Sequence, residues 1–553
     1  MTATALAADA ATQRRPPEQV MRLSRMGSAH PTRLSFLRTL LRRMQAEGWH
    51  FDRPVWQMDA RGVGRAVYRA IGPHHTYSLV AFAHDLPDHL RSDRVIATAW
   101  DATFALFDGT PTPADLDRLQ ANVPLQEAGR VTTRELTLAR ANRSVRLFAH
   151  VVDRLSQGQQ PDPTEIDAVG YLMRTTAVYG SGKFGAADRA TIADRPELRG
   201  PFQAEMLSVW LIRSFTVDLV EHLAAARGGP AATVLDPALR RRLGVGNSTG
   251  LGMAPFLIKH PILLNNWMLV REEALDRVRA QPESTPQTIA LFVAAVSDAQ
   301  RNAETWVSEH PIQQAKLADL RADLARIATK RVPATPNPWN ALWTWAERSL
   351  STEGQEALVA AMIEAHGPLV DGLSDCMDAD EDRAFALDGS VPLGQVRATL
   401  ARHYPWALDT DYSNPVHSAR FWYVSEEKLE PRLGERYSEP GAALELPIDT
   451  GRMVAALATA LSDWPDDQPL AQFLLAHPEH RFSARRVQQA TRYPYAEIQD
   501  NLIAADTLPI DLLRCKLAFF GASHFDPRSD RWVRITLFQG QPYPQDLATE
   551  PAL

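Results

Sequence analysis

Two glycine-rich segments that carry cations are the strongest candidates for chemistry in this 553-residue chain. The first segment, RTTAVYGSGKFGAADRA, contains Arg174, Tyr179, Ser181, Gly182 and Lys183. Closely spaced glycines let backbone N–H groups converge on a ligand, and the arginine and lysine can add charge-assisted hydrogen bonds to an anion. We therefore predict that residues 179–189 form a loop that contacts a phosphate or carboxylate group.

The second segment, RRRLGVGNSTGLGMAPF, begins with the arginines at positions 240, 241 and 242. Its glycines and hydroxyl side chains suit the same kind of ligand, and a helix beginning near Pro255 would add its positive dipole end. We predict a loop over residues 244–259 that forms the other wall of one anion site, provided that the two segments converge. The residues predicted to bind the substrate are Arg174, Ser181, Gly182, Gly246, Asn247, Ser248 and Thr249.

Neither segment matches a named nucleotide or nucleophile motif. A dinucleotide fingerprint requires a third glycine where Thr249 stands, and a phosphate-binding loop of the Walker type requires Gly and Ser or Thr where Ala177 and Phe184 stand. The spacing G-x-S-x-G around Ser248 lacks the apolar strand that should precede a catalytic serine. The alternative is that both segments are tight connections between helices and that the arginines are solvated.

Three residues near these segments are candidates for proton transfer: Tyr179, Lys183 and Glu205. Glu205 lies in the apolar run FQAEMLSVWLIRSFTVDLVEHLAAA, which we predict to be a buried helix because four charged residues interrupt it. A carboxylate in such a helix needs a partner or a shifted pKa. The alternative for Glu205 is a structural Glu–Arg pair.

A histidine cluster between residues 74 and 89 supports a different chemistry. It contains His74, His75, His84, Asp85, Asp88 and His89. Neutral imidazoles and carboxylates can bind zinc, iron or manganese, but no compact ligand spacing such as H-E-x-x-H occurs here. A metalloenzyme is therefore kept as an alternative to solvated hairpin histidines.

Composition limits the partners of the chain. A formal net charge of -7 with interspersed signs is unlike a nucleic-acid-binding protein, which would show a basic domain or stripe. Two cysteines 139 positions apart argue against a disulfide framework and against thiolate metal sites. Without an apolar segment long enough for a membrane span, or a signal-like N-terminus, we expect a cytoplasmic protein. A homo-oligomer is left open, and no cofactor can be assigned.

The periodicity of the sequence predicts an α+β fold that is mainly helical. We expect a flexible tail (1–28), an N-terminal mixed unit (29–111), a helical domain with the two loops (112–330), a Pro-rich linker (331–340), a helical segment (341–410) and a C-terminal α+β unit (411–553). The N- and C-terminal units contain the predicted antiparallel strands, which are placed so that they can share a sheet.

The function that fits these predictions is an enzyme acting on a small phosphate- or carboxylate-bearing metabolite bound between the two loops. The alternative is a non-catalytic scaffold protein in which Trp339 and Trp343, four residues apart on one helix, dock a partner. The same tryptophans can instead dock their helix against the rest of a domain.

Overall fold

The computed structural model describes residues 13–30, 32–90, 99–124, 131–175, 192, 194–249, 261–308, 311–377, 385–413, 422–424, 429–431, 447–499, 509–526 and 533–550. Contacts divide the chain into two compact units. Unit 1 comprises residues 1–33, 250–518 and 527–533, and unit 2 comprises residues 34–249, 519–526 and 534–553. The two units thus alternate along the sequence, and the largest part of unit 1 lies between two segments of unit 2.

Unit 2 is built on a nine-stranded sheet with the order β1-β2-β3-β4-β5-β6-β7-β11-β10. The pairs from β1·β2 to β5·β6 are antiparallel, whereas β6 and β7 are parallel. The strands are β1 (His50–Met58), β2 (Gly64–Ile71), β3 (Thr76–Ala83), β4 (Ala102–Asp108), β5 (Glu135–Arg143), β6 (Tyr171–Thr175), β7 (Gly244–Thr249), β10 (His524–Asp526) and β11 (Val533–Leu537).

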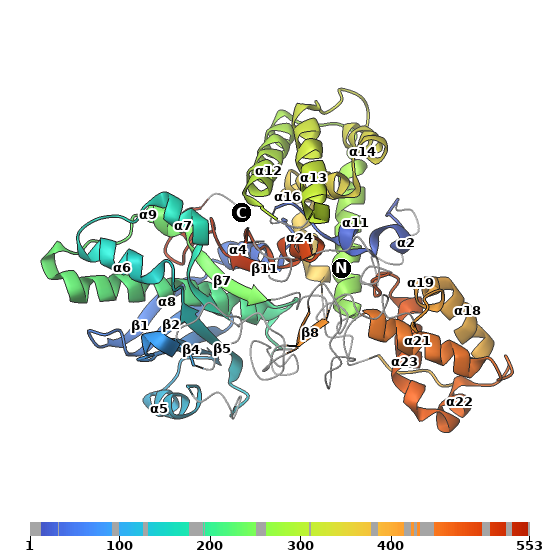
Figure 1. Ribbon diagram of the computed structural model, residues 1–553, viewed down its shortest axis with the longest axis horizontal. Coiled ribbons are helices and arrows are strands. Elements are labelled where there is room, and N and C mark those ends of the chain that lie inside the picture. Colours follow the sequence, from blue (N-terminus) through green and yellow to red (C-terminus); the bar gives the residue numbers. More distant parts are fainter. Residues whose placement is uncertain are drawn as a thin grey trace. The chain divides into compact units, whose positions relative to one another are not determined.

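The long helix α8 (Gln203–Gly228) packs on one face of this sheet (Figure 1) and carries Phe215, whose ring contacts Tyr68 and Phe104. The opposite face forms a core with α5 (Pro113–Asn122), through Leu116 and Leu119. Because both faces are covered, β3 and β4 are buried along almost their whole length. The remaining helices of unit 2 are α4 (Phe36–Ala46), α6 (Phe148–Ser156), α7 (Pro163–Val169) and α9 (Pro237–Arg242), with the short 3-10 helices Asp88–Leu90, Pro196–Leu198, Gly229–Ala231 and Leu547–Thr549.

Three strands lie where the sequence pattern predicts only helix. The prediction of an almost wholly helical region from residue 112 to 330 is wrong for β5, β6 and β7. The two last strands are only five and six residues long, and β7 is rich in glycine, so neither carries the alternation that identifies a longer strand. The prediction that N- and C-terminal strands share a sheet is confirmed, because β10 and β11 belong to the same sheet as β1 to β4.

Unit 1 is mainly helical. Figure 1 shows α12, α13 and α14 side by side in one group and α18, α21, α22 and α23 in another, the second group enclosing its own apolar core. A two-stranded hairpin, β8 (Trp422–Val424) and β9 (Leu429–Pro431), also belongs to this unit. The helices are α2 (Pro17–Val20), α3 (Leu23–Met26), α11 (Pro261–Arg279), α12 (Pro286–Thr305), α13 (Pro311–Thr329), α14 (Pro338–Ser349), α15 (Thr352–Glu364), α16 (Gly367–Val370), α18 (Leu393–His403), α19 (Pro405–Leu408), α21 (Pro447–Leu461), α22 (Leu470–Ala476), α23 (Arg481–Arg492) and α24 (Pro509–Phe520), with 3-10 helices at Asp371–Cys376 and Pro478–His480.

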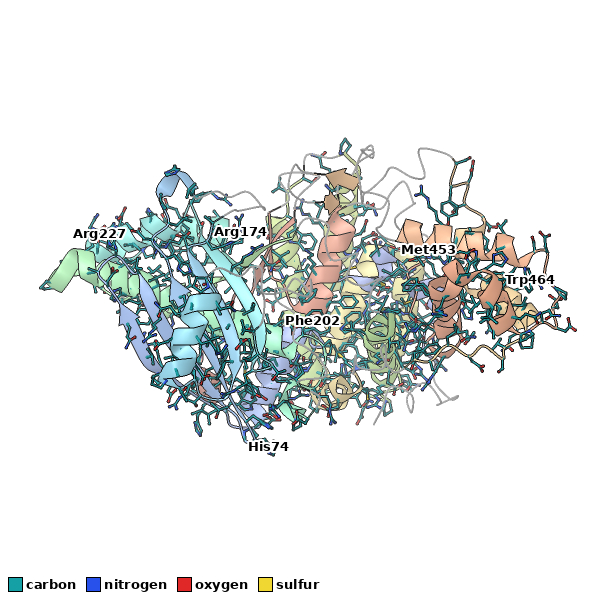
Figure 2. The ribbon with its side chains drawn as sticks, turned by 90° about the horizontal axis from the view of Figure 1, so that it is seen from below. His74, Arg174, Phe202, Arg227, Met453 and Trp464 are labelled. Carbon is teal, nitrogen blue, oxygen red and sulfur yellow. The ribbon has the colours of Figure 1, made fainter. Side chains whose placement is uncertain are left out.

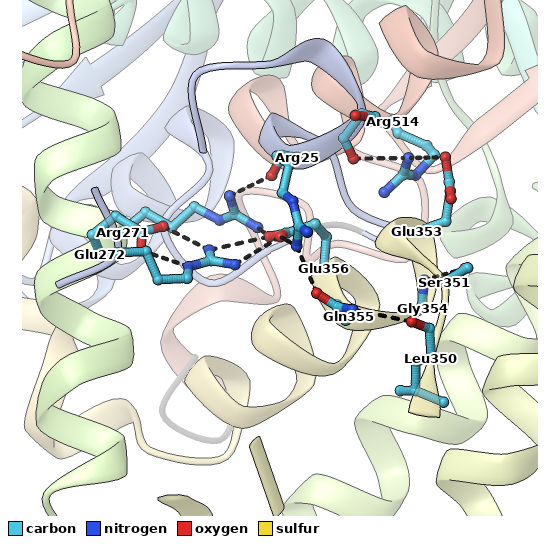
Figure 3. Close-up of polar contacts among 12 residues, drawn as sticks. Arg25, Arg271, Glu272, Leu350, Ser351, Glu353, Gly354, Gln355, Glu356 and Arg514 are labelled. Carbon is cyan, nitrogen blue, oxygen red and sulfur yellow. Dashed lines mark hydrogen bonds and ion pairs between the residues drawn. The ribbon is translucent and has the colours of Figure 1, made fainter. Parts of the chain in front are cut away.

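A buried charge network lies inside unit 1 (Figure 3). The carboxylate of Glu356 on α15 accepts hydrogen bonds from Arg15 at 2.7 Å, from Arg271 at 2.5 Å and from Arg25 at 3.2 Å. Arg15 also forms a bidentate pair with Glu272 of α11, at 2.7 and 2.8 Å. The side chains of Glu272 and Glu356 are fully buried, so this network ties the residues before α2 to two helices far along the chain.

The fold class is α+β and mainly helical, as the sequence predicts. Among the described residues, we find no helix that combines the length and the apolar character needed to cross a membrane.

Candidate functional site

The candidate site lies in unit 2 at the carboxyl ends of the parallel strands β6 and β7. In the register of this pair, Arg174 lies opposite Gly246 and Tyr171 lies opposite Gly244. The connection between them passes through α8 and α9, so both strands end at the same edge of the sheet. Thr175, the last residue of β6, and residues 246–249 of β7 therefore lie at this edge. Ligands of open sheets with parallel strands bind outside such carboxyl ends.

Asn247 joins the two strand ends. Its side-chain amide Nδ2 donates a hydrogen bond to the carbonyl oxygen of Thr175, the last residue of β6, at 3.1 Å. Asn247 is only 1% exposed, and its Oδ1 atom has no hydrogen-bond partner among the residues that the structure describes. Since an unpaired buried acceptor is costly, this atom is a candidate contact for a donor on a ligand.

A row of paired residues extends this edge across four strands. Ala83 pairs with Ala102, Ala102 pairs with Ala141, and Ala141 pairs with Thr175. Neighbouring strands are about 4.8 Å apart, so the row spans roughly 14 Å from β3 to β6. A row of this length is short enough for polar side chains beside it to contact one bound small molecule.

Asp101 organises the polar groups beside this row. Its backbone N–H donates to Asn142 Oδ1 at 2.8 Å, and its carboxylate accepts from the backbone N–H of Arg143 at 2.9 Å. His84, the residue that follows β3, forms a hydrogen bond between its Nε2 and Thr103 Oγ1 at 2.9 Å. Burial lowers the pKa of His84 below its usual value, and the nearby Asp101 only partly opposes this shift. A neutral imidazole of this kind can accept a proton at neutral pH.

Arginines give the edge a positive balance. Arg140 and Arg143 lie on β5 and Arg174 lies on β6, and Figure 2 labels Arg174 on the sheet. Arg140 stacks on Trp100 at 3.9 Å, whereas Arg143 lies 3.6 Å from the carboxylate of Asp101. Burial lowers the pKa of Arg140, although a guanidinium stays charged at neutral pH. Three arginines on the last residues of two neighbouring strands favour an anionic ligand.

Glu205 lies in the first turn of α8 and is 2% exposed, so the predicted buried helix is confirmed. Ser208 lies one turn after Glu205 on the same helix, and its Oγ lies 2.7 Å from Thr137 Oγ1 on β5. Since residues three apart share a helix face, Glu205 lies toward the sheet. Figure 2 labels Phe202, the left-handed residue that precedes the helix, and Arg227 near its other end. The positive end of the helix dipole stabilises a carboxylate at the position of Glu205.

The glycines of the second segment have a packing role that the sequence analysis did not predict. Residues 244–249 form the strand β7, so the prediction of a loop beginning at residue 244 is wrong for this part. A Cβ atom on Gly244 would lie 2.3 Å from the carbonyl oxygen of Leu537, and one on Gly246 would lie 2.7 Å from the ring of Tyr171. Both glycines are therefore needed for close strand packing, rather than for a flexible cradle.

The arginines at positions 240, 241 and 242 are also placed differently from the prediction. They end α9, before β7 begins, so they lie at the opposite end of β7 from Ser248. Arg240 pairs with Asp546 at 3.1 Å, Arg241 pairs with Glu550, and Arg242 pairs with Asp167 at 3.0 Å. These cations do not flank the candidate site, because they are used in ion pairs elsewhere.

Four of the predicted site residues, Tyr179, Ser181, Gly182 and Lys183, lie outside the described residues. Ser248 and Thr249 end β7, but only their backbone is described. The structure thus brings together Arg174, Gly246 and Asn247 of the predicted set.

The histidine cluster is spread over the sheet. His75 lies before β3 and contacts Glu197 at 2.7 Å, whereas His84 follows the other end of that eight-residue strand. Figure 2 labels His74 at the hairpin end of the sheet, remote from Arg174. No group of three or more metal-binding side chains occurs among the described residues.

The tryptophans proposed to dock a partner are internal to unit 1. Trp339 is fully buried against Phe292 and His366, and Trp343 is 1% exposed beneath the guanidinium of Arg15. They dock α14 against its own unit, which matches the second explanation that the sequence allowed.

The sequence analysis did not single out Asp101, Thr103, Asn142 and the arginines of β5. The signal for β5 is the alternation in ELTLARANR, in which Leu136 and Leu138 point to one face and polar residues end the strand. Identifying this strand would have placed Asn142 and Arg143 at a sheet edge.

Comparison with known proteins gives no relative for this chain. No family model, curated protein or solved structure matches it.

Proposed function

We propose that the protein is an enzyme acting on a small phosphate- or carboxylate-bearing metabolite, bound at the carboxyl ends of β6 and β7. The observation that carries the proposal is the parallel pairing of these strands, tied by the hydrogen bond from Asn247 to the carbonyl oxygen of Thr175. Because of this pairing, Arg174 and Thr175 of the first glycine-rich segment lie at the same edge of the sheet as residues 246–249 of the second. The change from antiparallel to parallel pairing at β6 is also the kind of position at which sheets open to a ligand.

The charge at this edge supports an anionic substrate. Arg140 and Arg143 lie on β5 and Arg174 on β6, and of these Arg143 lies 3.6 Å from the buried carboxylate of Asp101. A guanidinium binds carboxylate or phosphate through two parallel hydrogen bonds, which also fixes the orientation of the bound group.

The proposed roles combine the positions of the described residues with the candidates that the sequence supplies. Arg174 and Lys183 hold the anionic group, together with Ser181, Gly182 and the backbone of residues 246–249. Asn247 Oδ1 accepts a hydrogen bond from a donor on the same molecule. Tyr179 transfers a proton, with the neutral imidazole of His84 as a further acceptor at this edge. Glu205 is the other candidate for proton transfer, and it lies one turn before Ser208, which contacts Thr137 rather than the edge residue Ala141 of β5.

A thermal-shift screen against phosphorylated and carboxylated metabolites tests the binding step. A ligand at one hundred times its dissociation constant adds about 2.7 kcal/mol to the stability of the unit that binds it. We expect that Lys183→Ala and Arg174→Ala each remove most of this stabilisation. The matched control is Arg242→Ala, since Arg242 pairs with Asp167 at the other end of β7 and should leave the response unchanged.

Three results would contradict the proposal. One is a ligand response that survives in both Lys183→Ala and Arg174→Ala, and another is an equal loss in Arg242→Ala. The third is stabilisation by amines or uncharged metabolites alone. A ligand found in this way is then incubated with wild-type protein and with Glu205→Gln, and product formation is followed by mass spectrometry; turnover that requires Glu205 supports the enzymatic role.

A further inference from the structure

Unit 2 contains a cavity that the proposed function does not use. Its volume is about 330 Å³, and it is lined by β1, β2, α8, Arg240 of α9 and the segment from Tyr543 to Gln545. Arg240 lies before the start of β7, and β1 is the edge strand of the sheet. The cavity is therefore separate from the carboxyl ends of β6 and β7.

Helix α8 presents three polar residues to this cavity: Ser214, Asp218 and Glu221. Spacings of four and three residues place them along one face of the helix. Asp218 Oδ2 accepts hydrogen bonds from Arg53 and from the Tyr68 hydroxyl, both at 2.6 Å. Ser214 is 9% exposed, and its Oγ has no hydrogen-bond partner among the described residues. A buried hydroxyl in the wall of a cavity is a contact that a ligand can complete.

Glu221 is the acid of this cavity that is in no ion pair among the described residues, and its carboxylate accepts the backbone N–H of Leu235 at 3.0 Å. Each arginine in the wall is already paired: Arg53 with Asp218, Arg69 with Asp52, and Arg240 with Asp546 at 3.1 Å. Burial raises the pKa of Glu221 and the negative charge of Asp218 adds to this shift, whereas the Leu235 N–H and the charges of Arg240 and Arg53 oppose it. The lining itself holds three carboxylates and three arginines, so the additional carboxylate of Asp546 on Arg240 leaves this cluster with one more negative than positive charge when Glu221 is ionised.

Part of the wall is apolar. Phe51, Leu211 and Val217 line it, and Phe51 is held edge-on against Trp210 with ring centroids 4.9 Å apart. Since a water molecule occupies about 30 Å³ in the liquid, the cavity corresponds to about ten waters. A ligand of roughly ten non-hydrogen atoms matches that space, at the small end of ligand-binding pockets.

We propose that this cavity binds a small primary amine with an apolar body, whose ammonium group donates hydrogen bonds to Glu221, Asp218 and Ser214 Oγ. An ammonium has three donors and no acceptor, which matches these three acceptors on one face of α8. The apolar body lies against Phe51, Leu211 and Val217. An anion at this position is disfavoured because it would be repelled by Glu221 and the arginines of the wall already have carboxylate partners.

Three probes of similar shape test which ligand charge the cavity prefers. Phenethylamine, 3-phenylpropionate and 3-phenylpropanol are titrated into the full-length protein and followed by calorimetry and ligand-observed NMR. We expect saturable binding of phenethylamine, at least about tenfold tighter than that of the alcohol, because a charged hydrogen-bond partner contributes more than a neutral one. Equal or tighter binding of the carboxylate, or no binding of the amine, would overturn the proposal.

Variants of α8 locate the site. Glu221→Gln keeps the acceptor for Leu235 but removes the charge, and we expect it to weaken amine binding about tenfold or more. Ser214→Ala, which removes one acceptor, should weaken binding less. The matched control is Glu165→Gln on α7, whose carboxylate is exposed and pairs with His150 outside the cavity. Unchanged affinity in a folded Glu221→Gln variant, or an equal loss in Glu165→Gln, would overturn the assignment.

The pH dependence of binding provides an independent readout. The groups that face Glu221 are Asp218 on α8, Arg53 on β1, Tyr68 on β2 and Arg240 on α9. Because the Glu221 pKa is raised, amine affinity should increase as the pH rises through that pKa, and this increase should be absent in Glu221→Gln. An identical pH profile in the two proteins would contradict the role of Glu221. Lys183→Ala and Arg174→Ala leave this site intact, so its failure can be distinguished from failure of the proposed function.

Discussion

Replacing Glu356 by glutamine should strongly destabilise unit 1. Glu356 is one of two fully buried carboxylates that face the guanidinium groups of Arg15, Arg25 and Arg271. Glutamine has nearly the same shape, so the substitution removes the charge with little change in packing. It leaves three buried or partly buried cations around the single carboxylate of Glu272. Removing one partner of a buried ion pair typically costs about 3–5 kcal/mol, because the other charge stays buried and unmatched.

The pKa of Glu356 gives a second measure of this effect. Burial alone would raise that pKa, but the charges and hydrogen bonds of Arg15 and Arg271 outweigh burial and lower it from 4.5 to about 2. A shift of this size corresponds to about 3 kcal/mol of stability at neutral pH. Since the folded-state pKa is depressed, this stability is present above pH 4.5 and is lost as the pH falls toward 2. Both arguments therefore give a similar magnitude.

The assay is chemical denaturation at about pH 7 and about pH 3, with differential scanning calorimetry to separate the transitions of the two units. We expect Glu356→Gln to lower the stability of unit 1 by about 3 kcal/mol at pH 7 and by clearly less at pH 3. The control is Asp298→Asn on α12, which breaks an exposed pair with Arg301 and should cost at most about 1 kcal/mol. A stability within about 0.5 kcal/mol of wild type at pH 7 would refute the reasoning.

Three further changes test other parts of the structure. Gly246→Val should lower the stability of unit 2 by about 1–3 kcal/mol, because a side chain there meets the ring of Tyr171; an unchanged melting temperature would show that the strands can separate without cost. Burial lowers the pKa of Lys516 from 10.5 to about 7, so wild-type stability should rise by roughly 3 kcal/mol between about pH 7 and pH 9.5, whereas Lys516→Met should show no such rise in urea titrations. Thr112→Ala removes the capping box that Thr112 forms with Asp115 at the start of α5 and should cost about 1 kcal/mol, measured by thermal denaturation. Thr288→Ala, at the exposed start of α12, should cost no more than this, so a larger loss there would contradict the prediction.

Long and strongly patterned elements could be predicted from the sequence. The apolar run that became α8, the helices around Trp339 and after Ser351, and the strands β2, β3 and β4 all have enough residues to show their period. The strand β1 was missed because Pro54 lies within it. Proline is tolerated there since β1 is an edge strand and its register shifts between Asp52 and Val55.

The candidate site was only partly predictable, because its key relationships are between residues far apart in the chain. Arg174 and Asn247 were identified as candidates from their neighbours in sequence. Their parallel pairing depends on the crossover through α8, which no local pattern specifies. Likewise, the polar side chains around Asp101 come together only because β3, β4 and β5 lie side by side in the sheet. The proximity of Lys183 to Ser248 stays a prediction.

The position of β11 has a consequence for synthesis of the protein. β7 ends at Thr249 and unit 2 resumes only at Phe519 and Arg534, so residues 250–518 leave the ribosome before the sheet can be completed. At typical elongation rates, the 284 residues between Thr249 and Arg534 take roughly 15–60 s. During this time β7 is an open edge, Trp210 lacks its acceptor, the carbonyl oxygen of Pro542, and Arg213 lacks one of its acceptors, the carbonyl oxygen of Gln541. Unit 2 is therefore the first unit to begin folding and the last to finish, and its nascent chain should depend on chaperones that protect exposed strand edges.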